Sequence, residues 1–185
     1  DNSHYKNIPD GWWLCRLNDI VTISNGFAFR SSQYVNSGIR IIRITNVQDG
    51  KIDDSTPKYY PTSSYDDIKE FILKEDDLLM SLTGNVGRVC FISKQYLPAA
   101  LNQRVACIRG ISDMISVKYL YYYFQSRVFL AQCFASGRGI AQTNISTEWL
   151  KHHVICLPPI SEQERIIDKI NIIFNYIDKI IEQLT

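Results

Sequence analysis

The sequence predicts an α+β protein with a small twisted mixed β-sheet, packed helices and one long C-terminal helix. Short runs of β-branched residues alternate with turns that contain glycine or proline, as expected for the strands of a small sheet. Longer stretches repeat apolar residues at helical spacing. The chain has 185 residues, of which 45% are hydrophobic and 21% charged, and this composition excludes a mainly disordered protein.

The predicted strands are short apolar segments rich in isoleucine, valine and leucine. Residues 12–24 predict a strand, a tight turn and a second strand. The connecting segments contain Gly84, Gly87 and Pro98, which are common turn residues. Further strands are predicted at 39–44, 78–82, 89–92, 105–108 and 154–157.

Two helices are predicted before the last of these strands. Ser116 is a candidate N-cap for a helix that runs to about Ala135 and ends at Gly137. Its many aromatic residues are interpreted as core packing, in preference to a site that stacks a ligand. A shorter helix is predicted after Ser146.

A pair of prolines after residue 157 predicts a boundary between a domain at residues 1–157 and a helix at residues 158–185. Ser161 and Glu164 have the spacing of a capping box, which predicts that Ser161 caps this helix. The C-terminal helix is therefore expected to be a separate structural unit.

Apolar residues in this helix recur at spacings of 4, 3, 4, 3 and 4, which is the pattern of a coiled-coil seam. Ile167, Phe174 and Ile181 widen the stripe. A helix of about 24 residues is about 36 Å long, more than a small domain needs to cover its core. We therefore expect it to pair with a second helix, in another chain or another copy; the alternative is that it folds back on its own domain. The seam residues are Ile166, Ile170, Ile173, Ile177, Ile180 and Leu184.

Charge is balanced overall but unevenly distributed. The net charge of +1 provides no global basic field of the kind that marks many nucleic-acid binders. Residues 78–157 nevertheless carry eight basic and two acidic side chains, whereas residues 49–77 carry four basic and nine acidic ones. Any binding to nucleic acid must therefore depend on local groups of side chains.

The five cysteines are odd in number and widely spaced, which argues against a disulfide framework and against a CxxC-type metal site. No run approaches the roughly 18 continuous apolar residues that span a bilayer. We expect a reduced, cytoplasmic protein that does not bind a membrane.

No catalytic or metal-binding constellation is recognised. Residues 84–88 (GNVGR) lack the spacing of a nucleotide-binding motif, and the adjacent His152 and His153 point to different sides of any regular element. Acidic doublets at 53–54, 66–67 and 76–77 are interpreted as solvated turns and helix starts, although paired carboxylates hold Mg²⁺ in some nucleases. We therefore expect no catalytic residue, no metal and no cofactor in this chain.

Side chains suited to base edges or phosphates are concentrated in the predicted loops. Arginine can bond guanine bidentately and Asn or Gln can bond adenine, each pair worth about 1–3 kcal/mol of discrimination. Because Asn, Thr and Gly are also ordinary turn residues, a role in stabilising loops is kept as an alternative to base contact. Candidates for base contacts are Arg43, Asn46, Thr83, Asn85, Asn102, Gln103, Arg104, Gln142 and Asn144. Candidates for phosphate contacts, which position a duplex without reading it, are Arg30, Lys58, Arg88 and Arg138.

Seven segments occur in an order that resembles the specificity subunit of type I restriction-modification enzymes. The junction LPP-x-x-EQ-x-x-I contributes most to the specificity of this resemblance. The segments are IPDGWWLCRLNDI (8–20), GFAF (26–29), IRIIRITNV (39–47), DDLLMSLTGNVGRV (76–89), ALNQRVACI (100–108), IAQTNIS (140–146) and LPPISEQERII (157–167).

The resemblance implies a target recognition domain at residues 1–157, followed by a spacer helix that takes part in an antiparallel coiled coil. It implies that the domain reads one half of a split sequence in double-stranded DNA, while the helices set the distance between the halves. It also implies partners, namely the modification subunits, which methylate adenine, and the restriction subunit. S-adenosylmethionine, ATP and Mg²⁺ are then expected in those partners and not in this chain.

Family subunits contain two such units in tandem, whereas this chain contains one. It is therefore either the first or second half of a longer subunit, or a single-unit subunit that dimerises through its helix. Two other functions are kept as alternatives. One is a metal-dependent nuclease or methyltransferase fragment that uses the acidic doublets, and the other is a coiled-coil assembly module that reads no bases.

Overall fold

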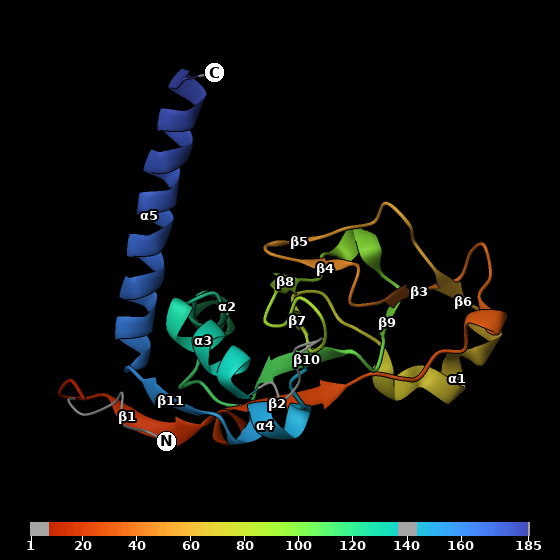
Figure 1. Cartoon of the computed structure of the whole chain (residues 1–185), viewed down its shortest axis with the longest axis horizontal. Coiled ribbons are helices and arrows are strands. Elements are labelled where there is room, and N and C mark those ends of the chain that lie inside the picture. Colours follow the sequence, from red (N-terminus) through yellow and green to blue (C-terminus); the bar gives the residue numbers. More distant parts are fainter. Residues whose placement is uncertain (1–7, 137–143, 185) are drawn as a thin grey trace.

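The computed structural model describes residues 8–136 and 144–184, and α5 projects from a body that contains all the strands (Figure 1). The α-helices are α1 (Tyr65–Ile68), α2 (Val117–Phe124), α3 (Arg127–Ser136), α4 (Thr147–His152) and α5 (Ile160–Leu184). The strands are β1 (Trp13–Arg16), β2 (Val21–Asn25), β3 (Ile39–Ile42), β4 (Val47–Gln48), β5 (Lys51–Ile52), β6 (Tyr59–Tyr60), β7 (Leu78–Ser81), β8 (Val89–Phe91), β9 (Ala99–Leu101), β10 (Val105–Gly110) and β11 (Val154–Leu157).

The α+β class is confirmed, but the strands within the described ranges form four small sheets in place of the single sheet predicted. An antiparallel sheet has the order β2-β10-β7-β8, and a second sheet, β6-β3-β9, contains the parallel pair β3 and β9. β1 pairs with β11, and β4 pairs with β5. Because β4, β5 and β6 are two residues each, they offer too few backbone groups to extend one continuous sheet.

The main hydrophobic core lies between the four-stranded sheet and the helices. Successive side chains of β7 point to opposite faces of the sheet, so that Leu78 and Met80 contribute to this core while Leu79 contributes to a second one. Phe124 and Phe129, from α2 and α3, fill the main core and are completely buried. The interpretation of the aromatic residues in this region as core packing is confirmed for these two.

The segment predicted as one helix from Ser116 forms two helices. α2 ends at Phe124, and the Ser126 hydroxyl then accepts a hydrogen bond from the Phe129 amide at 3.2 Å, as a serine at the start of a helix does. Ser116 precedes α2 as predicted, but its side chain makes no capping hydrogen bond. The predicted end at Gly137 lies outside the described residues.

The shorter helix after Ser146 is confirmed. The Ser146 hydroxyl accepts a hydrogen bond from the Trp149 amide at 3.0 Å and caps α4. β11 follows and ends at Leu157, as predicted.

α5 has 25 residues and begins at Ile160, so the predicted cap at Ser161 is wrong. The carbonyl oxygen of Pro159 accepts hydrogen bonds from the amides of Glu162 and Gln163 at 2.9 and 3.0 Å. The fixed backbone of proline suits the start of a helix, and the helix therefore begins one residue earlier than the serine. At Glu162, hydrogen bonds from Arg165 hold the pKa of the carboxyl below its usual value.

Candidate nucleic-acid interface

Three polar segments meet at the end of the four-stranded sheet where β7 finishes. The Leu82 amide donates to the Arg104 carbonyl oxygen at 3.1 Å, and the Ile145 amide donates to the Leu82 carbonyl oxygen at 3.0 Å. Thr83 and Asn144 form a bridge between the same segments. The structure thus brings together candidate residues that lie up to 61 positions apart in the sequence, from Thr83 to Asn144.

The loop at residues 84–88 is fixed by Ser81 and by glycine geometry. The Ser81 hydroxyl accepts a hydrogen bond from the Arg88 amide at 3.2 Å and donates to the Asn85 carbonyl oxygen. Gly87 has a φ of +85°, and a Cβ atom there would lie 2.7 Å from Leu130 Cδ2 in α3. The left-handed φ therefore favours glycine here, and a larger residue would also have to displace the Leu130 side chain.

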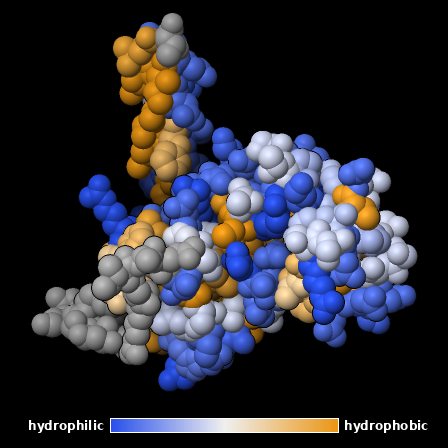
Figure 2. Space-filling model, turned by 45° about the vertical axis from the view of Figure 1, so that its right-hand side comes forward, coloured by the Kyte–Doolittle hydropathy of each residue, from blue (hydrophilic) through white to orange (hydrophobic). Residues whose placement is uncertain are grey.

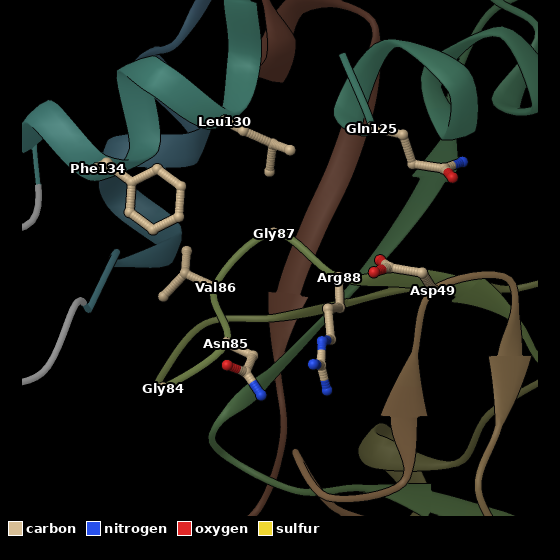
Figure 3. Close-up of a pocket in the computed structure, with 9 residues that line it drawn as sticks. All are labelled: Asp49, Gly84, Asn85, Val86, Gly87, Arg88, Gln125, Leu130 and Phe134. Carbon is tan, nitrogen blue, oxygen red and sulfur yellow. The ribbon is translucent and has the colours of Figure 1, made fainter. Parts of the chain in front are cut away.

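Arg88 is held between two amide side chains. Its Nη1 atom donates to Gln48 Oε1. With the Asn85 amide turned so that its oxygen faces Arg88, that oxygen lies 3.1 Å from both terminal guanidinium nitrogens. Asn85 and Arg88 point to the same side of the loop, away from Leu130 and Phe134 (Figure 3). The guanidinium is thus partly immobilised beside an exposed amide.

The same loop lines a hollow of about 370 Å³, to which Asn85 and Arg88 also contribute (Figure 3). Val86, Leu130 and Phe134 supply apolar walls, and Asp49 and Gln125 add polar groups to the lining. The hollow contains no pair of titratable groups suited to catalysis.

The turn at residues 102–104 presents two exposed side chains, those of Gln103 and Arg104. The Asn102 side-chain oxygen accepts a hydrogen bond from the Arg104 amide at 3.3 Å, which stabilises the turn. The backbone amides of Asn102 and Gln103 donate to Ile42 and Phe27 at 3.0 and 3.1 Å and tie the turn to β3 and to the segment after β2. Gln103 and Arg104 are therefore available to a ligand, whereas Asn102 has a structural bond.

The interpretation of Asn46 as a base-reading residue is wrong. Its side chain is 3% exposed, and its amide accepts a hydrogen bond from the Arg43 backbone at 2.9 Å and donates to the Asp53 carbonyl oxygen at 2.8 Å. Arg43 is half-buried and donates from Nη2 to the Thr56 carbonyl oxygen at 2.7 Å. Both side chains therefore stabilise the loop around β4 and β5.

Two further cations lie apart from the loops around β7. Arg30 follows Phe29, whose ring centroid is 4.9 Å from that of Tyr60 in β6, and Lys58 directly precedes β6. Both side chains are exposed, at the edge of the three-stranded sheet opposite β9. Arg138 and Gln142 lie outside the described residues.

The acidic doublets have structural partners. Asp77 pairs with Arg109, Asp54 pairs with Arg40, and Asp53 accepts a hydrogen bond from the Ser55 amide at 2.9 Å. The doublet at 66–67 lies in the first turn of α1. In residues 8–136 and 144–184, no three His, Cys, Asp or Glu side chains are grouped as metal ligands. No helix in these ranges has the length and hydropathy of a membrane span.

The apolar stripe of α5 is covered at its start and exposed further along. Ile167 is buried against the main core, and Ile166 and Ile170 are half-buried. Beyond them one side of the projecting helix is continuously apolar (Figure 2). The exposed fractions are 55% for Ile173, 51% for Phe174, 44% for Ile177, 56% for Ile180, 53% for Ile181 and 81% for Leu184.

Sequence reasoning missed two residues that the structure makes prominent. Gln48 holds Arg88, and Gln163 is completely buried at the base of α5. Gln163 stands in the helical column of Ile167, Ile170 and Phe174. A polar residue in an otherwise apolar column is the sequence feature that could have identified it.

Comparisons with known proteins identify the family of this chain. Residues 9–185 match the family model described as Type I restriction modification DNA specificity domain. The specificity subunit of the EcoAI type I restriction enzyme from Escherichia coli is 34% identical over 168 residues, covering 89% of this chain and 28% of that subunit. The MjaVIII specificity subunit from Methanocaldococcus jannaschii is 27% identical over 180 residues, covering 95% of this chain and 42% of that subunit. The chain therefore spans less than half the length of these relatives.

Solved structures share the fold. A chain from a structure of a type I R-M system, determined for its assembly and conformational transition, matches with a TM-score of 0.73 at 21% identity, over 95% of this chain and 41% of that one. The HsdS subunit from Thermoanaerobacter tengcongensis matches with a TM-score of 0.66 at 22% identity, over 97% of this chain and 39% of that one. Because the family match spans nearly the whole sequence, the chain belongs to the family of type I restriction modification DNA specificity domains.

Proposed function

We propose that this chain is a non-catalytic, DNA-reading part of a type I specificity subunit and binds one half of a split target in double-stranded DNA. The observation that carries the proposal is Arg88, held between Gln48 and Asn85 where three polar segments meet. Membership of the specificity-domain family supports it.

A guanidinium held by two amides is positioned before DNA arrives, so that little side-chain freedom is lost on binding. Arginine has five N–H donors, and the contacts of Arg88 leave some of them for a ligand. Guanine O6 and N7 accept such a pair in the major groove. The exposed amides of Asn85, Gln103 and Asn144 suit adenine, and Arg104 suits guanine or phosphate. We therefore assign Arg88 to base reading, in place of the phosphate contact expected from sequence.

We further propose that the exposed stripe of α5 pairs with a second helix of the same kind. The residues from Ile173 to Leu184 are too apolar and too exposed to be stable in water without a cover. The second helix belongs either to another copy of this chain or to the other half of a longer subunit. Two recognition domains joined through rigid helices would hold a fixed separation.

The proposed partners are the modification subunits and the restriction subunit of the same system. In this proposal they carry S-adenosylmethionine, ATP and Mg²⁺, and this chain contributes neither a catalytic residue nor a cofactor site. A methylated adenine would have to leave the duplex stack, and its pocket would belong to the modification subunit.

Selection from a randomised duplex pool tests the DNA-reading role. At low ionic strength, where phosphate attraction is least screened, the chain should retain duplexes that share a short motif. Arg88→Ala should relax the motif at one position and cost about 1–3 kcal/mol of affinity for the best duplex. Lys94→Ala is the matched control, because Lys94 is an exposed cation beyond the far end of β8 and should leave the motif unchanged.

The outcomes separate the competing roles. If Arg88→Ala weakens binding to all duplexes equally, Arg88 contacts phosphate and reads no base. If the unaltered chain, alone and with a modification subunit, enriches no motif, the DNA-reading proposal fails and the assembly-module function is favoured. Cleavage of duplexes by this chain in Mg²⁺ would favour the nuclease alternative.

A further inference from the structure

Gln163 connects α5 to the body of the molecule through three backbone groups. Its side chain is completely buried. The Oε1 atom accepts a hydrogen bond from the Ser116 amide at 2.9 Å, and the Nε2 atom donates to the carbonyl oxygens of Met114 and Pro158 at 2.8 and 2.9 Å. Both amide hydrogens and the carbonyl oxygen are thus used, and the partners lie before α2 and before α5.

The position of Gln163 explains why it is polar. It stands at the first place of the column that continues with Ile167, Ile170 and Phe174. An apolar side chain at this place would leave the amide of Ser116 and two carbonyl oxygens without their present partner in a buried region. Gln163 therefore supplies the hydrogen bonds that these backbone groups need at the place where the apolar stripe of α5 meets the body of the molecule.

A second contact between α5 and α2 lies farther along the helix. The Tyr122 hydroxyl donates to Asn171 Oδ1 at 2.6 Å, and its ring centroid is 6.3 Å from that of Phe174. Gln163 and Asn171 are separated by eight residues, or about 12 Å of helix. With Ile167 buried against the main core between them, these two contacts hold α5 at separated points along its length and so fix its direction.

We infer that Gln163 is a positioning residue that sets the direction of α5, and through it the separation at which two recognition domains can bind DNA. The second part of this inference depends on the proposed function. From Gln163 to Leu184 the helix extends about 32 Å, so that a tilt of about 10° moves its end by about 5 Å. One base-pair step is about 3.4 Å, and a tilt of this size therefore changes the accessible spacing by one step or more.

A distance measurement tests the direction of α5 without DNA. Spin labels attached through noncanonical amino acids at Lys94 and Lys179, both exposed, report the distance between the body and α5 by double electron–electron resonance. Gln163→Leu should broaden or shift the distance distribution. Gln183→Leu is the matched control, because it makes the same substitution at an exposed place in α5 and should change nothing. An unchanged distribution in Gln163→Leu would overturn the inference.

Tyr122→Phe provides a milder variant in case Gln163→Leu does not fold. It removes only the hydroxyl that donates to Asn171 and keeps the ring beside Phe174. It should broaden the same distribution by less than loss of Gln163 does, because the three bonds of Gln163 remain. If neither variant changes the distribution, the two attachments do not set the direction of α5.

Duplex selection then tests the effect on spacing. The unaltered chain should enrich two half-sites at one separation, and Gln163→Leu should enrich the same half-sites spread over neighbouring separations. A single separation retained by Gln163→Leu, or enrichment of one half-site alone by an unaltered chain that sediments as a dimer, would overturn the spacing role. If the unaltered chain enriches no motif, the proposed function fails, while the distance measurement still decides the role of Gln163 in positioning α5.

Discussion

Asp77 and Arg109 face each other on neighbouring antiparallel chain segments, where the guanidinium donates from Nε to Oδ1 at 2.6 Å and from Nη2 to Oδ2 at 2.5 Å. Asp77 is 4% exposed, and its Oδ2 atom also accepts a hydrogen bond from the Lys74 amide at 2.7 Å. The hydrogen bonds to Asp77 hold the pKa of Arg109 above its ordinary value. The pair joins β10 to the turn that precedes β7.

Asp77→Asn should therefore destabilise the fold. The change leaves the Arg109 charge without its partner, and because Arg109 is partly exposed we expect a loss of about 2 kcal/mol in the free energy of unfolding. Urea denaturation measures it. Asp76→Asn is the control, because Asp76 is exposed and has a φ of +65°, a conformation that asparagine tolerates. This change should lower the free energy of unfolding by less than about 0.5 kcal/mol. Equal effects of both changes on a metal-dependent activity would instead support the nuclease alternative.

The buried cysteines predict a loss of stability at alkaline pH. Burial raises the pKa of Cys90, Cys107 and Cys133 to about 12, above the value near 9 of an exposed thiol. The folded state thus favours the protonated thiols. Their contribution to the free energy of unfolding is therefore complete below pH 9 and is lost as the pH rises from 9 to 12. Cys107→Ala should flatten the pH dependence of the unfolding free energy by about 1.4 kcal/mol per pH unit in this window. If the unfolding free energy of the variant falls with pH as steeply as that of the unaltered chain, the raised pKa of Cys107 is contradicted.

Ile173→Asp should disrupt pairing of α5 while the domain stays folded. Ile173 is 55% exposed, so the change removes no core contact of the free chain. In a paired helix, however, an unpartnered charge costs about 3 kcal/mol or more, which weakens association by about a hundredfold. Sedimentation velocity measures the mass of the unaltered and altered chains. Asn175→Asp, on the opposite side of α5, should leave association unchanged, and an associated Ile173→Asp chain of unchanged mass would contradict helix pairing.

Gly87→Ala should strain the loop that carries Arg88. Alanine is disfavoured at a φ of +85°, and its Cβ atom would lie 2.7 Å from Leu130 Cδ2, so we expect a loss of about 1–2 kcal/mol of stability. The displaced loop should also weaken selection of the DNA motif. Gly110→Ala is the comparison. A Cβ atom at this position would lie 3.3 Å from its nearest neighbour, Val117 Cγ2, and the φ of Gly110 lies outside the left-handed region. Equal losses of stability from the two changes would show that neither the left-handed φ of Gly87 nor its close approach to Leu130 adds to the cost.

The positions of most strands could be predicted because a run of β-branched residues is a local signal. Their partners could not, since Trp13 pairs with Leu157 and Ile23 with Ile108 across long stretches of chain. The break between α2 and α3 had a local signal in Ser126, but the apolar pattern continues across it.

Residue type alone could not separate base readers from loop supports. Asn46 and Asn85 both lie within three residues of the end of a predicted strand, yet Asn46 is buried and Asn85 is exposed. The two side chains differ in their partners. Asn46 donates a hydrogen bond to the Asp53 carbonyl oxygen, whereas the Asn85 amide lies beside the Arg88 guanidinium. Gln48 and Gln163 were missed for the same reason, because their partners come from distant segments.

The antiparallel pairing of β1 with β11 places the entrance and the exit of the domain side by side, directly before α5. The described residues between Arg16 and Val154 therefore form a cassette whose two ends meet in one ribbon of two strands, and the cassette also contacts α5 through Met114, Ser116 and Tyr122. Domains whose ends lie close together tolerate exchange and insertion well. A replacement cassette with different loops would leave the direction of α5 unchanged as long as it keeps these contacts with Gln163 and Asn171. Under the proposed function, such an exchange would supply a new target half in one step without rebuilding the assembly.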